Sequence, residues 1–106
     1  MRPDPVRDAV IATRQPMVFA DAQNDERIPE SGRSFFTRTL IRSTGVFPLL
    51  AQDDVLGVLS VASHRPLVFD QGQRELLEGM AIQVATAVKG VQVYEELRES
   101  QERLRQ

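Results

Sequence analysis

The sequence predicts an α+β domain, with an antiparallel sheet, flanking helices and a long C-terminal helix. Two apolar stretches rich in valine and leucine, 45–52 and 55–63, are separated by an Asp-Asp pair, which is the pattern of a β-hairpin. From residue 77 onward, apolar side chains recur at helical spacing. The chain has 106 residues, of which 42% are hydrophobic and 6% aromatic, so it has room for one small domain with a mainly aliphatic core.

The N-terminal part predicts one short helix and one short strand. Asp4 is a typical helix N-cap and the proline that follows it fits a first helical turn, so we expect a helix over 5–14. The segment 17–21 is expected to form a strand. The segment 22–32 is rich in polar and turn residues and is expected to form a loop.

Residues 34–42 predict a second short helix. Phe36 and Leu40 are one helical turn apart, and Arg38 and Arg42 share another face at the same spacing. The arginines make this stretch of the chain locally cationic.

The second arm of the hairpin, 55–63, has no polar face. Its two alternating sets of side chains are both largely apolar, so we expect both faces to be covered, as in a central strand. Gly57 and Ser60 leave room for a close neighbour. In the first arm, Pro48 has no amide hydrogen for a sheet ladder and therefore predicts a strand edge or a β-bulge.

The C-terminal helix is expected to run from residue 71 to near the end of the chain. Asp70 and Gln73 form a capping-box pattern at its start. Apolar side chains then repeat at spacings of four and three residues: Leu77, Ala81, Val84, Val88 and Val91. We expect this stripe to lie against the sheet or against a partner helix.

A second repeat near the C-terminus predicts a coiled coil. It has 3-4-3 spacing and consists of Tyr94, Leu97, Gln101 and Leu104, with charged residues between. Tyr94, Leu97 and Leu104 are therefore expected to form the seam of a two-stranded coiled coil. The alternative is an amphipathic tail that stays solvated without a partner. We divide the chain into a domain over 1–92 and a helical coiled-coil linker over 93–106.

Three stretches, taken in order, resemble the later part of a GAF domain, a small-molecule sensor module of signalling proteins. VRDAVIATRQPMVFADAQNDERI (6–28) is similar to the family's short helix, strand and Asp-x-Arg loop. IRSTGVFPLLAQDDVLGVLSVAS (41–63) is similar to its two following strands. FDQGQRELLEGMAIQVATAVKGVQVYEELRES (69–100) is similar to its closing helix, which in many members leads into a signalling helix. Arg14 stands where the family usually has glycine.

The resemblance implies a truncated GAF/PAS-like fold, because the family's first long helix and first two strands have no counterpart in the sequence. Without those strands, one edge of 55–63 would be unpaired. We therefore expect a homodimer in which a second copy covers this edge, by edge pairing, by exchange of elements or by packing of the terminal helices.

The resemblance also implies a small effector bound between the sheet and the 34–42 helix, which forms a lid in the family. The candidate ligand-binding residues are Phe19, Asp21, Arg33, Phe36, Arg42 and Phe47. Arginines can hold a phosphate or carboxylate through paired hydrogen bonds, but a solvated helix face is the alternative. For the phenylalanines, the alternative is packing in the core.

Several functional classes find no support in the sequence. With no cysteine, the chain has no thiol nucleophile and no attachment site for a covalent bilin, and it lacks the residue through which some GAF-type proteins reduce methionine sulfoxide. His64 is the single histidine and has no second metal-ligating residue type beside it, so haem is not expected. No phosphate-binding loop or catalytic motif is present, so we expect no enzyme. The net charge of −2 argues against a nucleic-acid or anionic-membrane binder, and no apolar run approaches the roughly 20 residues of a membrane span.

The sequence therefore predicts a non-catalytic sensory module of a cytoplasmic bacterial signalling protein, with the identity of its effector left open. In a longer parent chain, the C-terminal helix would pass the signal to an output domain such as a histidine kinase or a cyclic-dinucleotide enzyme. The alternative is a dimerisation or interaction module that binds no ligand.

Overall fold

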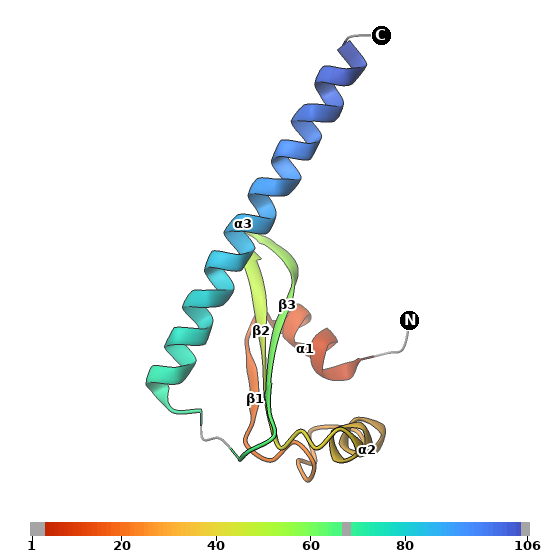
Figure 1. Ribbon diagram of the computed structural model, residues 1–106, viewed down its shortest axis with the longest axis vertical. Helices are drawn as coiled ribbons and strands as arrows, with labels where there is room; N and C mark the ends of the chain where they lie inside the picture. Colours follow the sequence, from red (N-terminus) through yellow and green to blue (C-terminus); the bar gives the residue numbers. More distant parts are fainter. Residues whose placement is uncertain (1–3, 67–68, 105–106) are drawn as a thin grey trace.

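The structure, a computed structural model, describes residues 4–66 and 69–104 and has the predicted α+β class. Its elements are α1 (Pro5–Thr13), β1 (Met17–Phe19), α2 (Glu30–Arg38), β2 (Ser43–Ala51), β3 (Asp54–Ser63) and α3 (Gln71–Leu104). Figure 1 shows a small sheet with α1 and α2 beside it and α3 extending well past it. The molecule is correspondingly elongated, measuring 57 × 33 × 23 Å along its principal axes.

The three strands form one antiparallel sheet in the order β1-β2-β3, so that β2 is central. β2 and β3 form the predicted hairpin, with Gln52 and Asp53 in the turn. The register of this hairpin shifts between Leu49 and Leu50, which confirms a bulge close to Pro48. β1 pairs with β2 only as far as Val46, so at Pro48 the central strand has a neighbour on one side only.

The unpaired edge expected for 55–63 is confirmed within the described residues, but its expected cover on both faces is wrong. β3 is an edge strand within the described residues, and its side chains are half-buried or exposed. The strand that is covered on both faces is β2, whose first seven residues are all buried. Both strands have apolar side chains on both faces, so composition alone did not show which of them lies in the middle.

The helix boundaries follow from local capping. The Asp4 carboxylate accepts a hydrogen bond from the Arg7 amide at 3.1 Å and starts α1, and the Asp70 carboxylate accepts one from the Gln73 amide at 2.8 Å and starts α3. α2 begins four residues earlier than expected, at Glu30, and ends before Leu40, because Leu40 adopts a left-handed conformation with φ 62°. That conformation terminates a helix.

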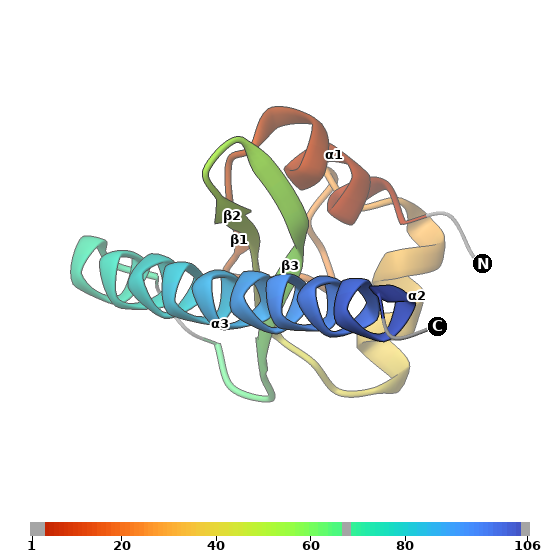
Figure 2. The ribbon, with the colours of Figure 1, turned by 90° about the horizontal axis from the view of Figure 1, so that it is seen from above.

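The sheet carries a separate hydrophobic cluster on each face. On one face, α3 packs Ala81 and Ala85 against Phe47 and Leu49 of β2, and all four are buried. On the other face, Phe19 packs with Ala22 and Ile28 of the following loop. Figure 2 shows α3 crossing one side of the sheet, with α1 on the other.

The stripe predicted for the C-terminal helix is partly corrected. Leu77 and Ala81 face the sheet as expected, but the next buried residue is Ala85. Val84 and Val91 are 38% and 57% exposed. At about 100° per residue, Ala85 lies about 40° from Ala81 around the helix, whereas Val84 lies about 60° away in the opposite direction, so the contact with the sheet follows the four-residue spacing of Leu77, Ala81 and Ala85.

Candidate functional site

A cavity of about 560 Å³ lies between the sheet and the two short helices α1 and α2. Its size is within the range of roughly 300–1,000 Å³ that is usual for small-molecule sites. The lining residues are Asp4, Pro5, Val6, Arg7, Phe19, Ile28, Pro29, Ser31, Gly32, Phe35, Phe36, Arg38, Ile41, Thr44, Val46, Ser60 and Ala62. Most of them are apolar, and the charged members are Asp4, Arg7 and Arg38.

The floor of the cavity is formed by two cross-strand pairs of β2 and β3. Thr44 lies opposite Ala62, and Val46 lies opposite Ser60. Directly opposed residues of antiparallel strands point to the same face of a sheet. Because three of these four side chains are small or short, the floor leaves space that a leucine-rich strand pair would fill. The Thr44 hydroxyl donates to the Val61 carbonyl at 2.9 Å and is thus already satisfied.

One wall of the cavity is the fully buried ring of Phe19. The guanidinium of Arg27 lies 4.5 Å from the centre of this ring and forms a cation–π contact with it. Arg27 also donates two hydrogen bonds to the Asp25 carboxylate, at 3.0 and 2.7 Å, and one to the Val18 carbonyl at 3.1 Å. The Asp25–Arg27 pair therefore fastens the loop after β1 to the strand itself.

The same pair explains the electrostatics of this wall. The Arg27 side chain, through its hydrogen bonds to the carboxylate, holds the pKa of Asp25 below its ordinary value of 3.8. Correspondingly, the bond to Asp25 raises the pKa of Arg27. Both groups remain ionised around neutral pH, and the ion pair is partly exposed to solvent.

The cover of the cavity is α2. Phe35 and Phe36 point their rings into an edge-to-face contact, with centroids 5.6 Å apart. Phe36 packs on the Phe19 cluster, while Phe35 is 48% exposed. None of the nine residues of α2 is buried, so this helix covers the space without filling it.

The structure brings together only part of the predicted ligand-binding set. Phe19 and Phe36 line the cavity. Phe47 does not, because it points to the other face of the sheet and is fully buried against α3. Asp21 and Arg42 are exposed and lie outside the lining.

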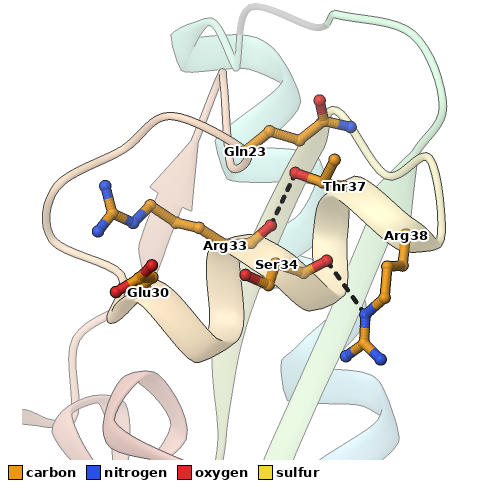
Figure 3. A pocket seen from close by; sticks show the side chains of 6 residues that line it. All are labelled: Gln23, Glu30, Arg33, Ser34, Thr37 and Arg38. Atoms are coloured by element: carbon orange, nitrogen blue, oxygen red, sulfur yellow. Dashed lines mark hydrogen bonds between the residues drawn. The ribbon is translucent and has the colours of Figure 1, made fainter.

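Arg33 lies over a different, open groove on the outer side of α2. This groove is lined by Gln23, Glu30, Arg33, Ser34, Thr37 and Arg38 and is shown in Figure 3. The hydrogen bonds drawn there join Thr37 to the Arg33 carbonyl and Arg38 to the Ser34 carbonyl, so they stay within the helix. The groove is formed by one helix face and one glutamine, whereas the cavity is enclosed by a sheet and two helices. We take the cavity as the candidate ligand site for this reason.

Most of the cavity lining was not predicted from the sequence, and neither were two residues beside it, Gln23 and Arg27. Gln23, Arg27 and Ile28 lie in the stretch 22–32, which was expected to form a polar loop and which resembles the family's Asp-x-Arg loop, but none of the three was expected at the site. The Asp25-x-Arg27 spacing carried a usable signal, since an aspartate two residues before an arginine can accept from both its backbone and its side chain. No local sequence pattern predicts a role at the site for Gln23 or Ile28.

A second surface lies along the side of α3 that faces away from the sheet. The residues there follow a seven-residue repeat in two series, Leu76, Gln83, Gly90, Leu97, Leu104 and Met80, Ala87, Tyr94, Gln101, and all of them are exposed. The predicted seam residues Tyr94, Leu97 and Leu104 are 67%, 56% and 85% exposed. Large apolar side chains stand at both ends of these series, whereas Gln83, Ala87 and Gly90 lie between them. The helix α3 crosses residue 92 without a break (Figure 1).

Comparison with known proteins identifies the fold. The family model for the GAF domain matches residues 1–88. The chain belongs to the GAF family. No curated protein matches the sequence.

Solved GAF domains share the fold at low sequence identity. The GAF domain region of a Geobacter sulfurreducens PCA protein, described as a membrane protein, has a TM-score of 0.72 and 24% identity, covering 84% of this chain and 60% of that one. The GAF domain of a two-component sensor histidine kinase from Bacillus halodurans has a TM-score of 0.72 and 17% identity, covering 89% and 64%. A type II free methionine-R-sulfoxide reductase from Thermoplasma acidophilum has a TM-score of 0.66 and 16% identity, covering 82% and 57%. The chain thus spans less than two thirds of the length of each of these structures.

Two further findings bear on this GAF domain. Within residues 4–66 and 69–104, no group of three or more histidine, aspartate or glutamate side chains is placed to hold a metal ion. In the same part of the chain, no helix combines the length and the apolarity that crossing a bilayer requires.

Proposed function

We propose that this GAF domain is a non-catalytic sensory module that binds a small effector in the cavity and transmits its presence through α3. The observation that carries the proposal is that the cavity and α3 share the same two strands. Thr44, Val46 and Ser60 face the cavity, whereas Phe47 and Leu59 face the helix. An effector that moves the floor of the cavity therefore also moves the surface on which α3 rests.

The sensory role is supported by the family, since the GAF domain of a sensor histidine kinase has the same fold. An effector transmits a signal only when it binds two arrangements of the protein with different affinity. The chain contains no cysteine, which supports a role other than thiol-based reduction. In a longer parent chain, α3 would connect to an output domain such as a histidine kinase or a cyclic-dinucleotide enzyme.

The experiment is a thermal-stability screen with cyclic nucleotides, organic acids, amino acids and haem. A compound present at 100 times its dissociation constant should stabilise the protein by about 2.7 kcal/mol. Ala62→Leu, which fills the floor of the cavity, should abolish that stabilisation, whereas Ala12→Leu on the exposed part of α1 should preserve it. A compound that stabilises the Ala62→Leu variant equally well binds elsewhere, and this would reject the cavity as the site.

The exposed outer side of α3 supports a second element of the proposal, a homodimer. Large apolar side chains at Leu76, Met80, Tyr94, Leu97 and Leu104 are in solvent in the single chain. A parallel coiled coil of two α3 helices would bury them. The same surface favours the alternative function, a dimerisation module without a ligand.

Leu97→Glu tests the dimer, because it places a charge at a core position of the seam. We expect the dimer dissociation constant to rise at least tenfold in analytical ultracentrifugation. Gln92→Glu adds the same charge on the outward side of a coiled coil and should leave association unchanged. Equal association constants for the two variants would remove the coiled coil from the proposal.

A further inference from the structure

The two ends of α2 are held very differently. At its N-terminal end, Pro29 occupies the cap position and makes no side-chain capping hydrogen bond. That end rests on Ile28, and the contact is so close that a Cβ on Gly32 would lie 2.8 Å from the Ile28 Cγ2. A contact between apolar surfaces has no directional bond to keep it in place.

The C-terminal end of α2 is fixed by the backbone. The amide of Ile41 donates to the Phe36 carbonyl at 2.9 Å and the amide of Leu40 donates to the Thr37 carbonyl at 3.3 Å, which together form a Schellman motif. Directly after it, the Arg42 amide donates to the Ser63 carbonyl at 2.8 Å and so joins this turn to the end of β3.

Two side chains tie this turn to distant parts of the chain. The His64 Nδ1 donates to the Leu40 carbonyl at 2.9 Å. The Gln23 carboxamide Nε2 donates to the Phe36 carbonyl at 3.3 Å and to the Ile41 carbonyl at 3.0 Å. Both partners are acceptors, so only the NH₂ group of the amide can satisfy them. Both hydrogen bonds are partly buried. Removing the donor there costs more free energy than at a solvated position, because water does not fully replace the donor.

We propose that Gln23 is a positioning residue that holds α2 over the cavity, with the turn at 39–42 as the pivot. Removing its two hydrogen bonds would release the last turn of α2 from the loop that follows β1. The helix would then be held by its backbone bonds, by the His64 bond to the Leu40 carbonyl and by the packing of Phe36 and Ile28 in the Phe19 cluster. This inference rests on the cavity being the functional site, since it assigns how access to that cavity is controlled.

Hydrogen–deuterium exchange of the free protein tests the proposal without any effector. Gln23→Glu keeps the size of the side chain but replaces the NH₂ donor with an acceptor facing two carbonyls. We expect the amides of α2 to exchange at least tenfold faster, while those of β2 keep their wild-type rates. An apolar dye, 1-anilinonaphthalene-8-sulfonate, should bind more tightly to the same variant because the cavity is more accessible.

Gln92→Glu is the matched control, since it makes the same change at an exposed position of α3 outside the seam and should leave α2 exchange unaltered. If the glutamate variant does not fold, Gln23→Ala replaces it, since this variant also removes the donor but introduces no charge. The same acceleration of α2 exchange is then expected. Unchanged α2 exchange, or an equal acceleration in α2 and β2, would overturn the positioning role.

Gly32→Ala tests the pivot separately, because its methyl group pushes the N-terminal end of α2 away from Ile28. Exchange should then rise at residues 30–35 and stay slow at the turn of 39–42; a rise at both ends would overturn the pivot. A failed effector screen together with faster α2 exchange in Gln23→Glu would reject the sensory function and leave the role of Gln23 standing. The opposite pair of results would reject only the role of Gln23.

Discussion

The two faces of the sheet in this GAF domain are built from the same strands but packed in opposite ways. On the α3 face, Phe47 and Leu49 are in direct contact with Ala81 and Ala85, where small helix residues let the helix approach closely. On the other face, α2 spans an open space of about 560 Å³. The first face is a packed core and the second borders a cavity. Successive residues of a strand point to opposite faces, so core residues and cavity residues alternate along the chain.

This difference has a consequence for signalling. A dense interface transmits a displacement because its side chains have few alternative arrangements. A face that borders a cavity can bind a ligand without disruption of packed core side chains. The proposed sensory role needs both properties, which are separated here by the thickness of one sheet.

The largest expected difference between the two faces is in the stability lost when one phenylalanine on each face is truncated. Phe47→Ala should lower the free energy of unfolding by about 3–5 kcal/mol, because it leaves a cavity in a packed core. Phe35→Ala, in the half-exposed cover, should cost less than about 1 kcal/mol. Urea denaturation measures both. Similar losses at the two positions would show that the faces are packed alike.

Larger side chains on the two faces should also have different effects on stability. A Cβ on Gly45 would lie 2.9 Å from Cε2 of Phe47 and 3.3 Å from Cγ1 of Val18. Gly45→Ala should therefore destabilise the protein by about 1–3 kcal/mol, since the α3 face has no room. Ser60→Val adds more volume on the cavity floor and should cost less than Gly45→Ala. The reverse order in thermal denaturation would contradict a filled face and a hollow face.

A smaller effect is expected at the end of α1, which borders the hollow face. Arg14 adopts a left-handed conformation, with φ 59°, at the C-cap of α1. Arg14→Gly should raise the free energy of unfolding by up to about 1 kcal/mol, since glycine adopts this conformation without steric cost. Ala12→Gly, inside the same helix, should lower it by about the same amount. A loss of stability in both variants would mean that the arginine side chain has a role that the backbone does not reveal.

The smallest expected effect is the pH response of the cavity wall. Arg27 lowers the pKa of Asp25 in the folded protein, so the ion pair stabilises the loop fully at pH values above the ordinary pKa of 3.8. This stabilisation should be lost as the pH falls through the folded pKa, below 3.8. Because the pair is partly exposed, it should contribute less than about 1 kcal/mol. Asp25→Asn should remove the acid-induced rise in exchange of residues 22–29, and an equal rise in this variant would assign it to another group.

The order and type of the elements followed from local patterns. Asp4 and Asp70 cap the helices they were expected to cap, and Pro48 lies beside a bulge. The boundary of α2 was placed four residues too late, because its start has no side-chain cap to mark it. Phe19 and Phe36 were placed in the site from the resemblance to GAF domains, but that reasoning also included Phe47, which the tertiary fold points to the other face.

The sequence by itself determined which residues alternate along the strands, where α1 and α3 are capped and that the last helix carries a second set of apolar residues near its end. These properties depend on neighbours within a few positions, so they can be found in a local pattern. Only the tertiary structure decided which strand is central, which side of the sheet stays hollow and that Gln23 reaches two carbonyls 13 and 18 residues away. Each of these depends on what covers a surface, and the covering element comes from a part of the chain about which the local pattern carries no information.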